Sequence, residues 1–221
     1  MNKIAVILCG SGFRDGSEIR ESVAVLWALS QLEITPDCFA PDAAQFDVVN
    51  CLLDEVAPSE SRNQLVEAAR IARGNIRPLD QLEAKDFDAV IIPGGFGVAK
   101  NLCNFAAKGA QATVIPDLEK TLRDFHHAKK PIGAICIAPA VLALAFKGLG
   151  LELTVGKNSE VSQEIVKLGH RHIETDVTQC HTDQSHRVVT TAAYMDSSAP
   201  LHHIFQGISK LVNAVIGMIR N

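Results

Sequence analysis

Short apolar runs that alternate with helical segments constrain the fold of this 221-residue chain more than any other feature. Residues 3–9, 88–93 and 131–135 read as buried strands, because nearly every position in them is apolar. Strands of this kind are typical of a parallel sheet that is covered on both faces. The alternation with helices therefore predicts an α/β fold with a mostly parallel sheet between two helical layers.

The remaining elements follow from periodicity and turn residues. Further strands are expected at residues 37–40, 46–49, 151–155 and 187–191. Helices are expected at residues 17–32, 61–72, 98–108, 116–129, 138–146 and 197–219. No internal repeat, low-complexity stretch or long linker divides the chain, so we expect one domain over residues 1–221.

Charge and composition exclude several classes of partner. The net charge is −4, so no basic field points to nucleic acid or an anionic lipid surface. No apolar run approaches the roughly 18 residues of a membrane span. The apolar run at residues 4–8 is followed by Gly10 and charged residues without a signal-peptide cleavage pattern, which predicts a cytosolic protein.

The six cysteines show neither a C-x-x-C pair nor the spacing of a zinc site, so we expect no bound metal. Cys136 is distinct among them, because the buried strand at residues 131–135 runs directly into a helix at this position. That junction is typical of a nucleophile elbow, which lifts a side chain above the carboxyl edge of the sheet. A helix N-terminus there favours negative charge and predicts a lowered thiol pKa. The alternative is a small core cysteine at a strand end.

The segment I-I-P-G-G-F-G-V-A-K-N-L, residues 91–102, places Gly94 and Gly95 between a buried strand and a helix. Its loop leaves the same sheet edge as Cys136, so the Gly95 amide is a candidate to face that turn. The spacing matches neither the dinucleotide nor the P-loop fingerprint. A tight strand–helix turn is the simpler interpretation.

After the first strand, Asp15 and Glu18 have the spacing of a helix capping box. The functional interpretation is that Glu18 opens a helix beside the same crevice and exchanges a proton with the Cys136 sulfur. A carboxyl group near a thiolate has a raised pKa, because both groups resist being charged together. The two interpretations are compatible.

These motifs occur with longer strings: F-A-P-D at residues 39–42, S-R-N at 61–63, A-R-I-A-R-G at 69–74, P-G-G-F-G-V-A-K-N-L at 93–102, C-I-A-P at 136–139 and V-V-T-T-A-A-Y-M at 188–195. Together they resemble the ThiJ/PfpI superfamily, which is related to class I glutamine amidotransferases. They resemble most its ElbB branch of isoprenoid biosynthesis proteins with an amidotransferase-like domain.

The resemblance implies a flavodoxin-like three-layer sandwich that forms a homodimer. It implies that Cys136 is the nucleophile, Glu18 its acidic partner, and the amides of Gly95 and Ile137 an oxyanion-type site, with Gly94 beside them. It also implies a glyoxalase that converts glyoxal, a small aldehyde substrate, to glycolate without a cofactor.

The chain departs from the superfamily at histidine. Ile137 stands where PfpI proteases carry a histidine after the nucleophile, and residues 154–158 read T-V-G-K-N where other members carry one. His181, followed by Thr182 and Asp183, is the nearest analogue of the late H-x-E motif of amidotransferases. His181 is therefore a candidate that approaches the site from a neighbouring strand.

Three alternatives to the glyoxalase remain open at this point. An accessible, low-pKa cysteine also suits a redox or stress sensor that passes through sulfenic acid. A regulatory protein linked to isoprenoid metabolism is the second alternative. The third is an amidotransferase domain that serves a partner synthase, which release of ammonia from glutamine would distinguish.

Overall fold

The computed structural model describes residues 2–219 and is built around one seven-stranded sheet. Its strands are β1 Ile4–Ile7, β2 Asp37–Ala40, β5 Ile76–Pro78, β6 Ala89–Ile92, β7 Ile132–Ile135, β10 Cys180–Asp183 and β11 Val188–Thr191. Their order across the sheet is β10-β11-β7-β6-β1-β2-β5. Every neighbouring pair is parallel except β10 with β11. The carboxyl ends of β1, β6, β7 and β11 therefore meet at one edge.

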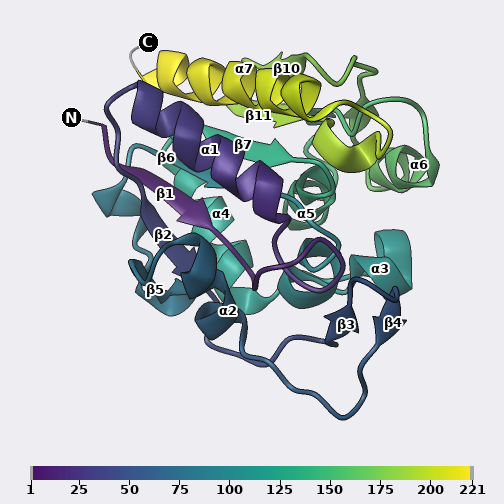
Figure 1. The fold of residues 1–221 in the computed structure, drawn as a ribbon. Coiled ribbons are helices and arrows are strands. Elements are labelled where there is room, and N and C mark those ends of the chain that lie inside the picture. The colour runs from purple at the N-terminus through teal and green to yellow at the C-terminus, as the bar shows by residue number, and fades with distance from the viewer. Residues whose placement is uncertain (1, 220–221) are drawn as a thin grey trace.

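Helices cover both faces of the sheet, which makes a three-layer, flavodoxin-like α/β fold (Figure 1). One face carries α1 Ile19–Gln31, α2 Gln64–Ile71 and α7 Leu201–Ile219. The other face carries α4 Pro116–His127 and α5 Ala138–Ala145. All residues of β1, β6, β7 and β11 are buried, as the continuous apolar runs predicted. The expected fold class is confirmed.

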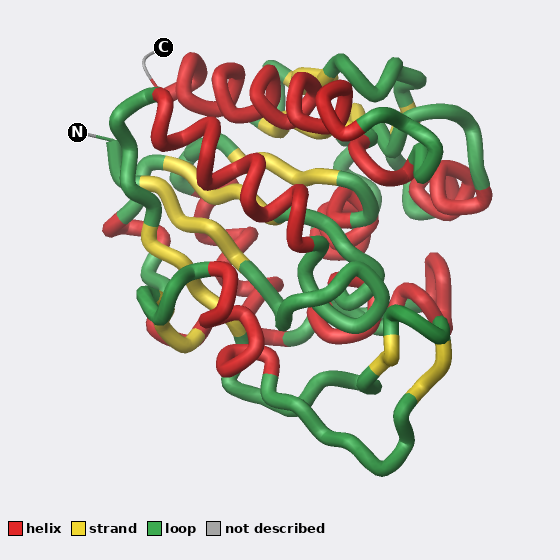
Figure 2. The backbone as a smooth tube through the Cα atoms, in the orientation of Figure 1, coloured by secondary structure: helices red, strands yellow, loops and turns green. Residues whose placement is uncertain are grey.

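Short elements extend beyond the carboxyl edge of the sheet, where loops predominate in the tube drawing (Figure 2). They are the hairpin of β3 Val49–Asn50 and β4 Glu55–Val56, and the helices α3 Phe105–Lys108 and α6 Glu160–Lys167. The small sheet of β8 Glu152–Leu153 and β9 Arg171–His172 lies instead against β10 and β11, where the Glu152 N–H donates to Asp183 and the Thr154 N–H donates to Thr190. The strand expected at residues 46–49 is wrong, since only its last residue enters β3. The helix α6 was not predicted.

The helix expected at residues 98–108 is two helices that do not run on from each other. A five-residue π-helix, η3, spans Val98–Leu102, and α3 begins only at Phe105. Cys103 between them is extended and forms an isolated bridge with Val114. Single π-turns of this kind occur often at functional sites.

Within residues 2–219, no helix has the combination of length and apolar character that crossing a membrane requires. Over the same residues, no three histidine, cysteine, aspartate or glutamate side chains converge as metal ligands.

Candidate active site

Cys136 lies at the turn between β7 and α5, at the carboxyl edge of the sheet. Its φ is +62°, a left-handed conformation that a residue with a Cβ adopts at a cost in free energy. The Cys136 N–H donates to the carbonyl of Thr191 at 2.9 Å, which joins this turn to the end of β11. The side chain is 8% exposed. The backbone is thus held in the sharp strand–helix turn that the sequence predicted.

The glycine loop after β6 approaches this turn so closely that two of its positions exclude a side chain. A Cβ on Gly94 would clash with the Cβ of Cys136 and lie 2.7 Å from Oε2 of Glu21. Gly95 has φ +109°, and a Cβ there would clash with the backbone at Glu18. The two glycines therefore allow the loops after β1, β6 and β7 to meet.

The backbone amides of Gly95 and Ile137 lie beside the Cys136 side chain, where they favour its ionised form and lower its pKa. Donors of this kind stabilise negative charge on a sulfur or on an oxygen next to it. The structure therefore brings together Cys136, Gly95 and Ile137, as the sequence and the resemblance suggested. The Gly94 N–H does not face the sulfur but donates to Oε2 of Glu21 at 2.8 Å.

Glu21 supplies the carboxyl group at this site. It is fully buried, and its carboxyl group lies beside the Cys136 side chain, since a Cβ on Gly94 would meet both of them. Besides the Gly94 N–H, it accepts the N–H of Tyr194 at 3.1 Å on Oε1. Burial raises the pKa of Glu21 to about 8, and the nearby Glu18 carboxylate acts in the same direction. Glu21 is therefore poised to hold or release a proton near neutral pH.

Glu18, the expected acidic partner, lies at the start of the same helix but makes a different contact. Glu18 is the N-cap of α1, and its Oε2 accepts the N–H of Glu21 at 2.6 Å. Burial raises the pKa of Glu18 as well, but its carboxyl group caps the helix instead of contacting Cys136. The expected Asp15–Glu18 capping box is also wrong, because Asp15 accepts the N–H of Val49 at 2.9 Å.

The sequence carried a signal for Glu21 that the motif search missed. The buried side of α1 includes Ala24, Val25 and Ala28, and Glu21 lies on that side at helical spacing. A carboxylate at an inward position of an otherwise apolar stripe is expensive unless it has partners. Its position in that stripe therefore distinguishes it from Glu18.

The direction of the Cys136 pKa also differs from the expectation. Burial raises the pKa of the Cys136 thiol, because a thiolate loses its contact with water, and the Glu21 carboxylate acts in the same direction. The N–H groups of Gly95 and Ile137 oppose this rise. Transfer of the thiol proton to Glu21 removes the repulsive charge and leaves a carboxyl O–H beside the sulfur. The reactive state is thus a property of the pair.

Comparison with known proteins decides the family. The sequence model of the DJ-1/PfpI family matches residues 48–203. The chain belongs to the DJ-1/PfpI family. The mitochondrial ES1 protein homolog of Rattus norvegicus is 44% identical over 97% of this chain and 83% of its own length. The human protein named glutamine amidotransferase-like class 1 domain-containing protein 3, mitochondrial, is 42% identical over 97% of this chain and 82% of its own length.

Solved structures of DJ-1/PfpI proteins agree with the fold. A crystal structure of an isoprenoid biosynthesis protein with amidotransferase-like domain from Ehrlichia chaffeensis superposes with a TM-score of 0.93 at 36% identity, covering 99% of both chains. Drosophila melanogaster DJ-1beta has a TM-score of 0.58 at 18% identity, covering 99% of this chain and 96% of its own, and shows the shared fold alone. The resemblance to the ThiJ/PfpI superfamily is confirmed.

The same comparison corrects the expected location. The two mammalian relatives and the ES1 protein of Danio rerio, which is 32% identical over 97% of this chain and 85% of its own length, are all named as mitochondrial. The expectation of a cytosolic protein is therefore wrong: these relatives point to a mitochondrial location.

His181 does not join the DJ-1/PfpI site in this chain. Its Nε2 lies 3.0 Å from Oε2 of Glu152, and β11 separates its strand from β7. Among residues 2–219, no histidine is hydrogen-bonded to Cys136, so the described site consists of thiol, carboxyl and amides.

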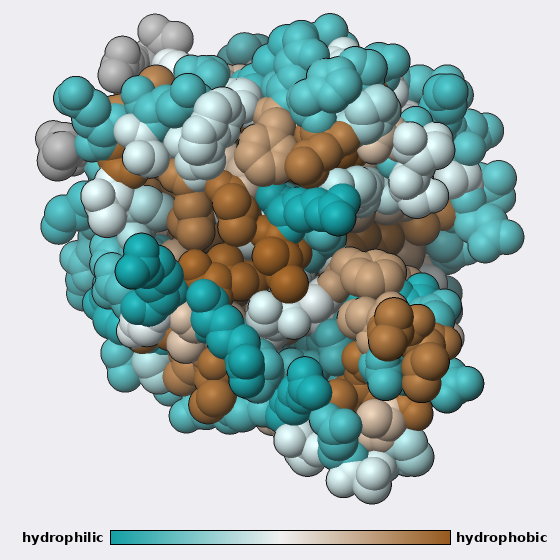
Figure 3. Space-filling view, viewed as in Figure 1, coloured by the Kyte–Doolittle hydropathy of each residue, from teal (hydrophilic) through white to brown (hydrophobic). Residues whose placement is uncertain are grey.

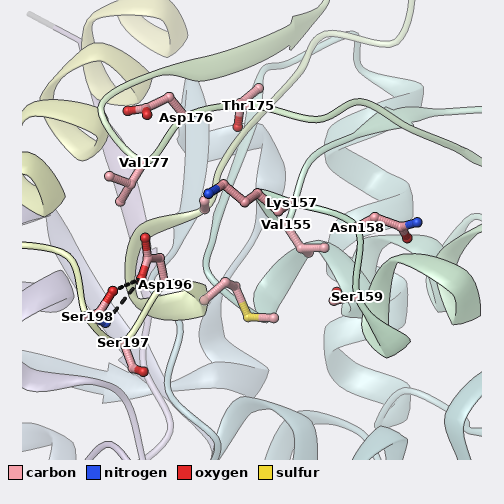
Figure 4. Close-up of a pocket in the computed structure, with 13 residues that line it drawn as sticks. Val155, Lys157, Asn158, Ser159, Thr175, Asp176, Val177, Asp196, Ser197 and Ser198 are labelled. Carbon is pink, nitrogen blue, oxygen red and sulfur yellow. Dashed lines mark hydrogen bonds between the residues drawn. The ribbon is translucent and has the colours of Figure 1, made fainter.

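A polar hollow of about 380 Å³ lies beside the end of β11. Residues 155–159 line part of it, and they overlap the segment that lacks the histidine found in other superfamily members. Figure 4 shows Lys157 extending between Asp176 and Asp196. Each carboxylate already accepts hydrogen bonds from its own turn, Asp176 from Thr178 and Asp196 from Ser198. Cys136 is not in the wall of this hollow.

Proposed function

We propose that this chain is a cofactor-independent, glyoxalase-like enzyme that converts glyoxal and other small 2-oxoaldehydes to hydroxy acids through Cys136. The observation that carries the proposal is the meeting of three groups at one sulfur: the buried carboxyl of Glu21 and the amides of Gly95 and Ile137. The DJ-1/PfpI family includes glyoxalase-like and stress-sensor members.

The first step forms a bond between the Cys136 sulfur and one aldehyde carbon of glyoxal. The thiol proton moves to the Glu21 carboxylate as the C–S bond forms. The carbonyl oxygen becomes an alkoxide, and the Gly95 and Ile137 amides beside the sulfur stabilise its charge. Glu21 then returns the proton to this oxygen, which leaves a hemithioacetal and a free carboxylate.

The second step moves hydrogen from one carbon to the other. The Glu21 carboxylate removes the proton from the sulfur-bearing carbon, which gives an enediolate, and delivers it to the neighbouring carbon. The hydroxyl proton of the hemithioacetal passes from the first oxygen to the second in the same isomerisation. The product is a thioester of glycolic acid on Cys136. Water hydrolyses the thioester and restores the thiol. The sum is glyoxal plus water to glycolic acid, an internal redox change that uses no external electron acceptor.

Glycolate formation from glyoxal tests this proposal in a buffer free of thiols and amines. We expect saturable turnover by the wild type and none by Cys136→Ala. We expect Glu21→Gln to lower kcat by about 100-fold or more, the range of general acid–base catalysis, and Glu18→Gln to keep most activity. Glutamine at position 18 retains a side-chain oxygen that caps α1.

Two results would contradict the proposal. Absence of turnover by the wild type would rule out the glyoxalase and favour the stress sensor, which predicts stoichiometric oxidation of Cys136 by peroxide. That experiment is done in the Cys51→Ser background, because Cys51 is an exposed thiol that peroxide would also oxidise. Loss of activity in Glu18→Gln with retention in Glu21→Gln would reverse the roles of the two carboxyl groups.

We further propose a homodimer, an arrangement common in the DJ-1/PfpI family. Ile19, Val23 and Trp27 repeat every fourth residue along α1 and remain between 44% and 47% exposed. Trp27 and Phe205 of α7 line an apolar hollow of about 610 Å³. Figure 3 shows apolar side chains gathered over α1 and the start of α7. A second copy would bury this surface.

A further inference from the structure

Glyoxal is smaller than the hollow that the protein provides beside Ile137, the residue that follows Cys136. A hollow of about 450 Å³ lies between α3 and α6, at the carboxyl edge of the sheet. Phe96, Phe105, Ile137 and Val161 form its apolar wall. The other wall residues are small or polar, and the only charged ones among them are Glu160 and Glu164.

Cys136 itself is not in the wall of this hollow, but two residues of the wall adjoin the proposed active site along the chain. Ile137 lines the hollow, and its own N–H is one of the two donors at Cys136. Phe96 lines the hollow, and it directly follows Gly95, which carries the other donor. If a substrate bound to Cys136 places its oxygen at these two amides, the rest of the substrate lies towards Phe96 and Ile137.

The Phe96 side of the hollow is fixed in place. The Phe96 N–H donates to the Phe13 carbonyl at 2.7 Å, and the Lys100 ammonium lies 5.3 Å from the centre of the Phe96 ring. Lys100 is itself paired with Asp47, with N–O distances of 2.5 and 2.8 Å, so its charge is already compensated. The ring remains 44% exposed and available for contact.

The charges at the rim select against anions. Glu164 accepts the N–H of Ala110 at 2.7 Å and pairs with Lys167 at 2.5 Å, which lies outside the wall. These partners hold the pKa of Glu164 below its usual range, so it stays ionised. Glu160 in the first turn of α6 adds a second carboxylate. A negatively charged substituent would meet the Glu160 carboxylate and the Glu164 carboxylate paired with Lys167, and among the described residues no cationic side chain lines the wall to attract it.

We propose that the preferred substrate is a 2-oxoaldehyde with an uncharged apolar substituent, an aryl group being the best fit, and that this hollow binds the substituent. The inference rests on the proposed function, because it assumes that the aldehyde reacts with Cys136. It makes Phe96, Ile137 and Val161 the residues that determine specificity.

Steady-state kinetics with glyoxal, phenylglyoxal and 4-carboxyphenylglyoxal test this inference, with glycolate and the mandelates measured directly. Val161→Phe fills the hollow, and Val166→Phe is the matched control, because Val166 lies on the same helix but is 54% exposed outside the hollow. Burial of a phenyl ring favours phenylglyoxal over glyoxal in wild-type kcat/KM by about tenfold or more. The carboxylated analogue is expected to react less well than phenylglyoxal.

For Val161→Phe we expect kcat/KM for phenylglyoxal to fall by about tenfold while that for glyoxal stays within about twofold. Val166→Phe is expected to change neither value. A wild-type preference for glyoxal, or an equal loss of both activities in Val161→Phe, would overturn the inference.

A binding experiment separates this inference from the proposed function. Acetophenone has the size of phenylglyoxal but no aldehyde, and ligand-observed NMR reports its binding without turnover. If the wild type reacts with none of the aldehydes, the proposed function fails. Acetophenone binding that is lost in Val161→Phe and kept in Val166→Phe would then still support an apolar subsite, and absence of binding to the wild type would overturn it.

Discussion

The carboxyl group of Glu21 is buried because it has partners for both oxygens. Gly94 donates to Oε2, Tyr194 donates to Oε1, and the Cys136 side chain completes the set. These contacts stabilise the ionised form, but burial outweighs them and leaves the pKa of Glu21 at about 8. The same group therefore links catalysis to the stability of the fold.

Glu21→Gln is expected to change how stability depends on pH. The pKa of Glu21 rises from 4.5 in the unfolded chain to about 8 in the fold, so the folded state binds the extra proton. The wild type should therefore lose stability as pH rises from about 4.5 towards about 8, with each pKa unit corresponding to about 1.4 kcal/mol. Urea midpoints at pH 5, 7 and 9 measure this dependence.

The difference in stability between the wild type and Glu21→Gln isolates the effect of Glu21 from that of the histidines with shifted pKa values. Burial lowers the pKa of His126, His170 and His172, so these residues add stability as pH rises and act in the opposite direction. The free energy of unfolding of Glu21→Gln relative to the wild type should increase up to about pH 8 and then level off. Parallel pH curves for the two proteins would contradict the raised pKa.

At the scale of the elements, α7 shows how tertiary contact decides the role of a glycine. A Cβ on Gly207 would clash with the carbonyl oxygen of Val177, so this helix approaches the neighbouring loop only because position 207 has no side chain. Gly217 lies in the same helix, and nothing lies within 4 Å of the Cβ that would be added there.

The two alanine substitutions are therefore expected to have opposite effects. Gly217→Ala should stabilise the protein by about 0.5–1 kcal/mol, because alanine is the better helix former. Gly207→Ala should destabilise it by about 1–3 kcal/mol, the usual range for overpacking. Chemical denaturation at one pH measures the change in free energy of unfolding for each variant. If both substitutions changed it in the same direction, the close approach of Gly207 to Val177 would not explain the effect at position 207.

The sequence predicts an element well when local residues determine its structure, and poorly when contacts with distant residues do. The bounds of β2, residues 37–40, and the turn at Cys136 follow from apolar runs and a strand–helix junction, which are local signals. The break at Cys103 is not local, because no proline or glycine marks it. It coincides with the bridge to Val114 and with Asn101, whose side chain binds the carbonyls of Cys9 and Asp15.

The candidate site divides in the same way. Cys136, Gly94 and Gly95 were predicted because each stands at the end of an apolar strand. Glu21 was missed because a capping motif at Glu18 drew attention to the first residue of the helix. Two-residue strands such as β9, Arg171–His172, are too short for periodicity to identify.

At the scale of the whole molecule, the exposed face of α1 and α7 predicts the state of assembly. Trp27→Glu places a charge in the apolar hollow and is expected to give a monomer where the wild type is a dimer. Light scattering after size-exclusion chromatography measures both masses. Val166→Glu is the control, since Val166 is 54% exposed on α6 and should leave the dimer intact. A monomeric wild type would contradict the proposed homodimer.

The order of the strands also has a consequence for synthesis on the ribosome. The groups at Cys136 come from Glu21 and from residues 94–95 and 136–137. The carbonyl of Thr191 and the amide of Tyr194, near the far end of the chain, hold the thiol turn and the Glu21 carboxyl group in place. A nascent polypeptide carries its cysteine long before it carries these last two partners. Reactivity therefore arrives late in translation, and an interrupted chain that ends before β11 lacks the finished site.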